Sequence, residues 1–418
     1  MSELQTWLER LEQLHPVEIE LGLSRVAEVA RRLGVQKPAP RVITVGGTNG
    51  KGSCVAVMEA LLCAGGHRVA AYTSPHLLRF NERVRIDGRE VDDVALVQAF
   101  EAVERVRGEI SLTYFEFSTL AALWLFQRAG VEYALLEVGL GGRLDAVNLV
   151  DADLAIITSV AVDHEAWLGS DREAIGREKA GILRPASPFV CADPEPPLSV
   201  VSSASSQGAR SYFINRDFAL SDGSYRFGDL RVEIPPISLP PNSIAAAITG
   251  VALLDGLPAC SLESVLRGIC LPGRCQQLHW RGRSLLLDVG HNPAAAQYLA
   301  GWLAANPVEG TNHALLAAMA DKDLSGLVAP LAPLVDRWQL ALLPENDRAA
   351  GCTELRAALE GVGIAAQAIE PRCEPVAEGF ELALSALGER DRLLVFGSFF
   401  TVAGVLQYIR DRSDGESG

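Results

Sequence analysis

The chain has 418 residues, of which 49% are hydrophobic and 21% charged, and this composition excludes global disorder and a single small module. Its 52 acidic residues outnumber 37 basic ones, and the formal net charge of −15 argues against nucleic acid or an anionic membrane as a partner. An acidic chain that binds a small anion needs a local source of positive charge, such as a helix N-terminus, a few basic side chains or a metal ion.

From residue 41 onward, short apolar runs alternate with longer segments of helical period, which predicts a mostly parallel sheet covered by helices. The predicted strands are 42–45, 68–73, 133–138 and 154–160. The predicted helices are 53–64, 92–108 and 114–129, the second capped by Asp92. Regular winding would place the second strand beside the first.

A Ser-rich, turn-rich stretch over 194–241 predicts a small β-rich insertion, and a helix is expected near 243–254. A second series of strands is predicted at 285–289, 314–319, 338–343 and 392–396. We therefore expect an α/β fold with a P-loop type domain over 1–270, a hinge over 271–280 and a smaller Rossmann-like domain over 281–418. Ligands of such sheets bind at the carboxyl ends of strands.

The eight cysteines form no C-x-x-C pair, and their scatter is typical of reduced, buried thiols rather than of a disulfide framework. The first residues lack the basic start and apolar run of a signal peptide, and no segment has about 18 consecutive apolar residues. We therefore expect a cytoplasmic protein without a membrane partner.

A glycine-rich loop, Gly46-Gly47-Thr48-Asn49-Gly50-Lys51-Gly52-Ser53, follows the first predicted strand and leads into a helix. Its glycines let backbone N–H groups turn toward a phosphate, the helix N-terminus adds partial positive charge, and Lys51 adds a full one. Val45 replaces the first glycine of the usual P-loop pattern, and Gly52 separates Lys51 from Ser53. The sequence favours a phosphate-binding loop over a ligand-free glycine turn.

Polar residues at the ends of three other strands are candidates for a cation site. Glu137 stands inside an apolar strand, where a charge is costly unless it is paired or metal-bound, so magnesium and neutralisation by Arg143 are the alternatives. Ser74 could present an oxygen to a cation or simply begin a strand-ending Ser-Pro turn. His164 is a candidate for the same edge, although a loop histidine is usually unremarkable.

Further candidates lie in a predicted helix and in the second domain. Lys179 falls in the predicted helix 171–183, where a solvated lysine is the ordinary expectation. The segment Asp288-Val289-Gly290-His291-Asn292-Pro293 ends a strand and begins a helix, and Gly397-Ser398-Phe399 ends a later strand. Both segments can offer polar groups to a ligand.

Together these motifs resemble the folylpolyglutamate synthase and dihydrofolate synthase family of the Mur ligase superfamily, over almost the whole chain. The segments that carry the resemblance are 47–53, 73–77 (Thr-Ser-Pro-His-Leu), 79–83 (Arg-Phe-Asn-Glu-Arg), 137–146 and 288–293. The extra Gly52 belongs to the P-loop pattern of this family.

The resemblance implies an ATP-dependent amide ligase of folate biosynthesis and one-carbon metabolism. The γ-phosphate of ATP would pass to a substrate carboxylate, and L-glutamate would attack the acyl phosphate to give an amide, ADP and phosphate. The acceptors would be dihydropteroate, which becomes dihydrofolate, and reduced folates, which receive further glutamates. A folylpolyglutamate synthase without the first activity is the nearest alternative, and another Mur-type ligase or a P-loop phosphotransferase is a more distant one.

The resemblance also implies roles for single residues. Lys51, Lys179 and His164 would act in catalysis, with a CO₂-derived carbamate on Lys179. The implied ATP contacts are Thr48, Asn49, Gly50, Lys51, Gly52, Ser53, Asn242, Arg274 and Asp288. The implied ligands of magnesium, for which we expect two ions, are Ser74, Glu137 and His164.

The substrate contacts implied by the resemblance lie in four regions. They are Glu18, Ile19, Glu20, Leu21, Thr113, Tyr114, Phe115, Glu116, Leu144, Asp145, Ala146, His291 and Ser398. Phe115 would stack on a pterin ring or, alternatively, pack in the core, and Asp145 would accept a hydrogen bond from the pterin amino group. His291 and Ser398 would contact glutamate, although the family often has His where this chain has Phe400. We expect a monomer.

Overall fold

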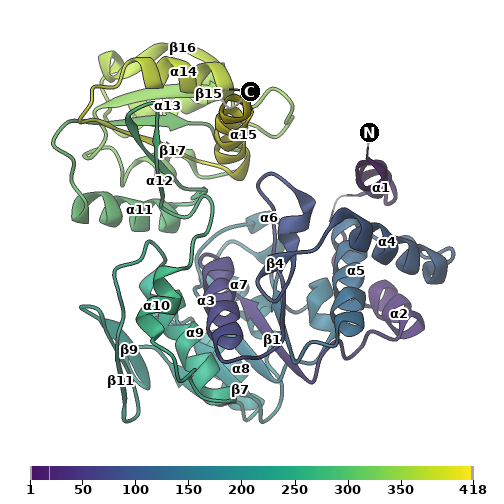
Figure 1. Cartoon of the computed structure of the whole chain (residues 1–418). Helices are drawn as coiled ribbons and strands as arrows, with labels where there is room; N and C mark the ends of the chain where they lie inside the picture. Colours follow the sequence, from purple (N-terminus) through teal and green to yellow (C-terminus); the bar gives the residue numbers. More distant parts are fainter. Residues whose placement is uncertain (1, 18, 416–418) are drawn as a thin grey trace. The chain divides into compact units, whose positions relative to one another are not determined.

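The computed structural model describes residues 2–17 and 19–415. The chain forms two compact units, Met1–Ile269 and Cys270–Gly418, and each is described by itself (Figure 1).

The described part of the first unit contains an eight-stranded sheet in the order β4-β3-β2-β5-β1-β6-β7-β8. All neighbours from β2 to β8 are parallel, and the short strands β3 and β4 are antiparallel at one edge. The strands are β1 (Arg41–Gly46), β2 (Val69–Tyr72), β3 (Val84–Ile86), β4 (Arg89–Glu90), β5 (Tyr133–Glu137), β6 (Leu154–Ile157), β7 (Pro188–Cys191) and β8 (Arg210–Phe213). The predicted mostly parallel α/β sheet is confirmed.

The expectation that β2 lies beside β1 is wrong, because β5 separates them. All five residues of β5 are buried, which suits a central place between two strands, whereas β2 carries the β3–β4 hairpin on its other side. Val45 pairs with Glu137 and Tyr72 with Leu136, so the ends of β1, β5 and β2 lie side by side.

Helices cover both faces of this sheet. On one face, α3 and α9 pack together and against the sheet, and on the other α1, α2, α4 and α5 enclose a core with β2 residues such as Ala70 and Tyr72 (Figure 1). The helices of this unit are α1 (Glu3–Gln13), α2 (Ser24–Leu33), α3 (Lys51–Ala64), η1 (Phe80–Arg83), α4 (Asp93–Arg107), α5 (Tyr114–Ala129), η2 (Ala146–Leu149), α6 (Glu165–Leu168), α7 (Arg172–Ala180), α8 (Leu198–Ser206), α9 (Pro241–Leu254) and α10 (Leu262–Arg267).

Helix α3 begins at Lys51, two residues before the predicted start at Ser53. Gly50 precedes it in the left-handed region, with φ +83°, and the Gly50 carbonyl accepts the backbone N–H of Cys54 at 3.0 Å. A residue without a Cβ allows this abrupt entry, so Lys51 lies in the first turn of the helix.

The prediction of a β-rich insertion over 194–241 is only partly right. Strand β8 extends the first sheet, because it pairs with β7. Before it, the Ser-rich segment forms helix α8, which buries Val200 and Ala204, an i, i+4 pair, in the core of the same unit. The separate antiparallel sheet consists of β9 (Phe218–Ser221), β10 (Ser224–Phe227) and β11 (Leu230–Glu233).

The described part of the second unit contains a six-stranded sheet in the order β12-β13-β17-β14-β15-β16, parallel except for β12. Its elements are β12 (Gln276–Trp280), β13 (Arg283–Leu287), α11 (Pro293–Ala305), β14 (Asn312–Leu316), α12 (Leu324–Val328), β15 (Arg337–Leu342), α13 (Cys352–Gly361), η3 (Ala366–Ala368), β16 (Ile369–Pro375), α14 (Val376–Ser385), β17 (Arg392–Phe396) and α15 (Phe399–Gly415). The sequence missed β12 and β16, which are edge strands with polar residues or two prolines.

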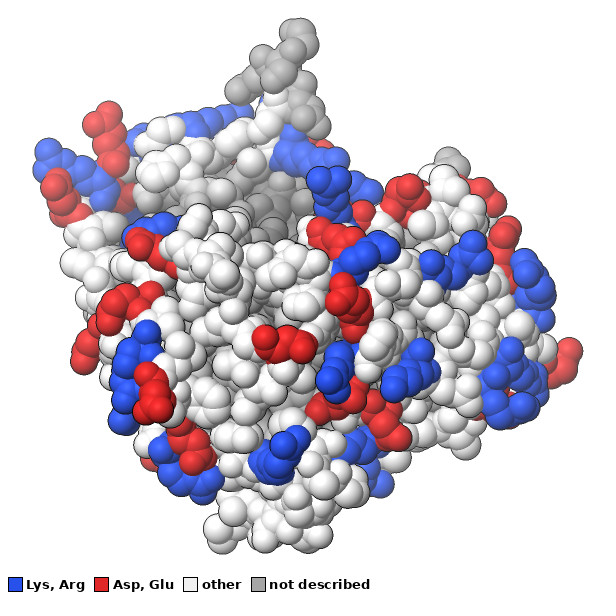
Figure 2. All heavy atoms as spheres, turned by 60° about the horizontal axis from the view of Figure 1, so that its bottom comes forward, with Lys and Arg blue, Asp and Glu red and all other residues white. Residues whose placement is uncertain are grey.

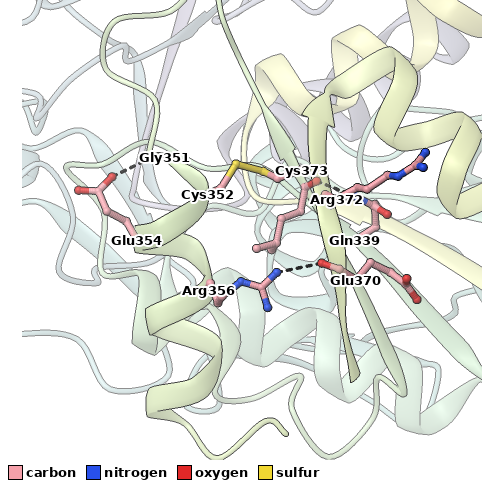
Figure 3. Close-up of a disulfide and its surroundings, with 9 residues drawn as sticks. Gln339, Gly351, Cys352, Glu354, Arg356, Glu370, Arg372 and Cys373 are labelled. Atoms are coloured by element: carbon pink, nitrogen blue, oxygen red, sulfur yellow. Dashed lines mark hydrogen bonds between the residues drawn. A yellow bond between two sulfur atoms is a disulfide. The ribbon is translucent and has the colours of Figure 1, made fainter. Parts of the chain in front are cut away.

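A disulfide joins Cys352, at the start of α13, to Cys373 in β16 (Figure 3). The interpretation of all eight cysteines as thiols is therefore wrong for this pair, because the fold brings together two residues that are 21 positions apart. Beside the bond, Arg356 donates to the backbone oxygen of Glu370 at 2.9 Å, which also fastens α13 to β16 (Figure 3).

Charge is mixed on the molecular surface that Figure 2 displays, where basic side chains of the described residues are interspersed with acidic ones. Among the described residues, no helix is both long and apolar enough to cross a bilayer.

Candidate nucleotide and substrate site

The glycine-rich loop that is predicted to bind phosphate connects β1 to α3, and hydroxyl residues that follow β6 hold it in place. The backbone N–H groups of Thr48 and Asn49 donate to the carbonyl and the Oγ of Ser159 at 2.8 and 3.0 Å. Gly47 has φ +143°, and a Cβ there would collide with Oγ1 of Thr158. Thr158 and Ser159 are not among the predicted site residues, because the predicted strand 154–160 included them, whereas β6 ends at Ile157.

Two side chains at the end of this loop, Lys51 and Ser53, differ in their contacts. Lys51 Nζ donates to the carbonyls of Gly47 and Thr48, both at 3.1 Å, so the cation is folded back over the loop. Ser53 is 1% exposed, and its Oγ makes no hydrogen bond with any described residue. A buried hydroxyl without a partner is costly, which makes Ser53 a candidate ligand for a phosphate or a cation.

The first turn of α9 lies against this loop. A Cβ on Gly50 would collide with the Oγ of Ser243, which is itself buried. Asn242 precedes Ser243 and is half-buried. The structure therefore brings a predicted ATP-binding residue from far along the chain to the neighbourhood of the P-loop.

Glu137 ends β5 between the P-loop and the loop that follows β2. It is buried, its Oε2 accepts the backbone N–H of Ser74 at 3.2 Å, and a Cβ on Gly52 would lie 3.6 Å from the same atom. Arg143, the alternative partner, instead forms an ion pair with Glu178 at 2.9 Å. The explanation of Glu137 as a carboxylate neutralised by Arg143 is therefore wrong.

Lys179 is 3% exposed, so the expectation of a solvated helix lysine is wrong. Burial lowers the pKa of Lys179 to about 7, the nearby charge of Lys51 acts in the same direction, and Asp163 and Asp145 oppose the shift. A neutral amine is thus a main form of Lys179 near neutral pH, which is the form that reacts with CO₂.

His164 is the N-cap residue of α6 and lies in the left-handed region, with φ +54°, and its backbone N–H donates to Oδ1 of Asp163 at 2.8 Å. Its side chain is exposed. Within residues 2–17 and 19–415, no three His, Cys, Asp or Glu side chains cluster as a metal site. The grouping of His164 with Ser74 and Glu137 stays a prediction.

The predicted pterin-binding residues meet at the N-terminus of α5. The half-buried ring of Phe115 lies 5.8 Å from that of Tyr72, and a Cβ on Gly139 would collide with the Phe115 ring at 2.6 Å. Asp145 accepts the backbone N–H groups of Leu140 at 2.8 Å and Val147 at 3.1 Å, and burial raises its pKa to about 6. Core contacts therefore position both side chains.

An ionic network connects the N-terminal segment to the start of α5. Thr113 and Glu116 form a capping box, and Arg25 donates to Glu116 at 3.1 Å. Arg25 also pairs with Glu20, which lies 2.8 Å from Nε2 of His15. Because the network involves both predicted substrate segments, it holds them side by side.

The other predicted substrate residues of the first unit differ in burial. Glu18 lies outside the described residues. Ile19, Leu21 and Leu144 are half-buried, and Ala146 is buried in the core.

In the second unit, Asp288 follows β13 and organises the adjacent turns. Its carboxylate accepts the backbone N–H groups of Cys275 at 2.8 Å and Gly290 at 2.7 Å. The backbone N–H of Val289 donates to the Gly273 carbonyl at 2.9 Å. The contacts of Cys275 and Gly273 attach the segment that carries Arg274 to the carboxyl end of β13.

Phe399 lies between two predicted ligand-binding residues at this edge. The Arg274 guanidinium lies 4.9 Å from the centre of its ring, and the His291 ring lies 6.1 Å away. Ser398 is buried and caps α15, because its Oγ accepts the backbone N–H of Thr401 at 3.0 Å. The structure thus brings Arg274, His291 and Ser398 together, while Phe400 is 55% exposed.

Comparison with known proteins gives one consistent family. Residues 273–399 match the family model described as Mur ligase, glutamate ligase domain. The dihydrofolate synthase/folylpolyglutamate synthase of Escherichia coli (strain K12) is 43% identical over 421 residues, which cover 99% of this chain and 97% of that protein.

Solved structures agree over the whole length. E. coli FolC in complex with DHPP and ADP has a TM-score of 0.92 at 41% identity and covers 99% of each chain. The bifunctional folylpolyglutamate synthase/dihydrofolate synthase of Yersinia pestis, complexed with AMPPNP and a Mn ion, has a TM-score of 0.91 at 41% identity and covers 98% of each chain.

Proposed function

The chain belongs to the dihydrofolate synthase/folylpolyglutamate synthase family of ATP-dependent ligases, and from this we propose that it joins L-glutamate to dihydropteroate and to reduced folates. One observation supports this proposal above the others: the glycine-rich loop after β1, the buried Glu137 at the end of β5 and the buried Lys179 lie near one another. Ligands of α/β sheets bind at the carboxyl ends of the strands, where this loop and Glu137 lie.

ATP binds, in this proposal, with its phosphates on the loop from Thr48 to Ser53. The backbone N–H groups at the start of α3 and the Lys51 ammonium supply positive charge, and the partnerless Oγ of Ser53 gains a partner. Asn242 lies beside the loop, and Arg274 and Asp288 are the proposed nucleotide contacts of the second unit.

Magnesium fits the residues at this edge. Ser53 has a buried hydroxyl without a hydrogen-bond partner among the described residues, and Glu137 has a buried carboxylate that faces Gly52 and accepts the backbone N–H of Ser74. Oxygen donors of this kind suit a hard divalent cation. Ser74, Glu137 and His164 are the proposed ligands of two ions, which when bound supply charge neutralisation to the phosphates.

A carbamate on Lys179 is proposed because its amine is buried and has a lowered pKa. The neutral Nζ attacks CO₂, a C–N bond forms, and the amine releases one proton, so that a would-be cation becomes an anion. The carbamate anion would be attracted to the nearby Lys51 ammonium, which favours its formation.

The reaction needs positioning and charge neutralisation rather than a protein nucleophile. The acceptor carboxylate attacks the γ-phosphate and releases ADP, and the amine of glutamate then displaces phosphate from the acyl phosphate. The pterin is proposed to lie on Phe115, with Asp145 and the segments 18–21, 113–116 and 144–146 around it. Glutamate is proposed to contact His291 and Ser398, and the match to a glutamate ligase domain supports this placement.

Purified protein with ATP, magnesium, dihydropteroate and L-glutamate should release ADP and form dihydrofolate. Omission of glutamate should abolish both products, whereas a P-loop phosphotransferase would release ADP without glutamate. Activity on a reduced folate but not on dihydropteroate would leave only the folylpolyglutamate synthase function. Monomeric state and cytoplasmic location stay predictions, which gel filtration and cell fractionation test.

A further inference from the structure

Arg83, the last residue of η1, is a buried cation. It is 9% exposed, and no described carboxylate forms an ion pair with it. Its Nε donates to Nδ1 of His76 at 2.8 Å, and its guanidinium lies over the rings of Phe80 and Tyr114 at 5.6 and 5.5 Å. Aromatic faces attract a guanidinium but do not neutralise its charge.

Two carboxylates of this region, Glu59 and Glu82, are engaged elsewhere. Arg85, two positions along the chain, pairs with Glu59 at 2.8 Å. Glu82 turns its carboxylate to the backbone N–H groups of Leu77 at 2.6 Å and of Leu78 and Arg79 at 2.8 Å. Arg85 therefore has an internal anion, whereas Arg83 has two Nη atoms that no described side chain binds.

Arg83 is connected to both halves of the proposed substrate site. Its carbonyl accepts the backbone N–H of Thr73 at 2.9 Å, and Thr73 leads directly to Ser74. Tyr114, beneath its guanidinium, precedes Phe115 at the start of α5. The cation thus lies near the proposed metal ligand and near the proposed pterin-stacking ring.

We propose that Arg83 binds the carboxylate of the acceptor substrate, the group that becomes the amide. A guanidinium matches a carboxylate with two parallel hydrogen bonds, and the flanking rings suit the aromatic ring that bears this carboxylate. The phosphates of ATP are a poorer match, because the P-loop follows β1 and β5 lies between β1 and β2. This role of Arg83 rests on the proposed function, and it makes Arg83 the residue that binds the reacting carboxylate.

The test compares the binding of dihydropteroate with that of its analogue lacking the carboxyl group, to the full chain without ATP or glutamate. The unsubstituted protein should bind dihydropteroate about ten- to a hundredfold more tightly, the range of a charge-assisted hydrogen-bonded pair. Arg83→Gln should bind both compounds equally, with the affinity that the unsubstituted protein has for the analogue. Arg79→Gln, at a nearby exposed arginine, should keep the preference.

Four outcomes would overturn the proposal. Equal affinity of the unsubstituted protein for the two compounds does so without any variant, even if Arg83→Gln fails to fold. A preference retained in Arg83→Gln, or an equal loss of affinity for both compounds, would assign Arg83 a packing role. Weakened ADP binding would point to phosphate instead. Glutamate-dependent ADP release is measured separately, so the ligase function is tested independently of the role of Arg83.

Discussion

The Oε2 atom of Glu137 accepts the backbone N–H of Ser74 at 3.2 Å and thereby joins the end of β5 to the loop after β2. The same atom faces Gly52 in the first turn of α3. One buried carboxylate therefore lies between the phosphate-binding loop and the segment that leads toward Arg83. This position follows from the central place of β5 in the sheet.

Glu137→Gln should lower magnesium-dependent ADP release about 100-fold or more, because the amide retains an acceptor for Ser74 but removes the charge that would hold the cation. Titration of Mn²⁺ in the presence of ATP should show weaker ion binding at unchanged circular dichroism. Glu132→Gln is the matched control, since Glu132 precedes the opposite end of β5 and pairs with His67 near the surface. Equal losses in both variants would contradict a metal role.

Lys179→Ala should remove most activity, and bicarbonate or acetate should restore part of it by supplying the missing anion. A ¹³C signal from ¹³CO₂ should appear in the unsubstituted protein and disappear in the variant. Lys37→Ala is the control, because Lys37 is exposed and should affect neither signal nor rate. Full activity of Lys179→Ala without rescue would refute the carbamate.

The lowered pKa of Lys179, about 7, also predicts a pH dependence. Only the neutral amine reacts with CO₂, so carbamate formation should increase as pH rises through about 7. In CO₂-free buffer, the folded chain binds fewer protons at this site than the unfolded chain between pH 7 and the ordinary lysine pKa. Its free energy of unfolding should therefore rise with pH in this window. Lys179→Met should flatten that slope in urea titrations, and an unchanged slope would contradict the shift.

Local patterns predicted some elements to the residue. Helix α5 was predicted with its observed bounds, because Thr113 and Glu116 form a capping box at its start and a glycine follows its last residue. Strand β17 is fully buried and apolar after its first residue, so its apolar run predicts its bounds. Both signals lie within the segment itself.

Other features depend on partners far along the chain and were not predictable. Nothing in the helix around Lys179 marks its lysine as buried, since its neighbours include Lys51, Asp145 and Asp163 from other segments of the chain. The insertion of β5 between β1 and β2 is a property of the whole sheet. Among the described residues Arg83 has no carboxylate partner, in contrast to Arg85, and this difference depends on where Glu59 and Glu82 point.

Phe399→Leu should raise the KM for ATP about 2- to 10-fold with little change in kcat, because it removes a cation–π contact with Arg274 but keeps an apolar side chain. Steady-state kinetics at saturating glutamate and folate measure the effect. The neighbouring Phe400→Leu is the control, since Phe400 is 55% exposed and contacts neither Arg274 nor His291 in the described ring interactions. A larger KM effect from Phe400→Leu would place the nucleotide contact elsewhere.

Loss of the Cys352–Cys373 bond should destabilise the protein by about 3 kcal/mol, because the bond closes a loop between residues 21 positions apart and restricts the unfolded chain. Urea unfolding of Cys352→Ser/Cys373→Ser under non-reducing conditions measures this. Thiol titration of the unfolded, unreduced protein should find six of the eight cysteines reactive. Eight reactive thiols, together with equal stability of the double variant, would show that the two cysteines are reduced and would support the interpretation first drawn from their spacing.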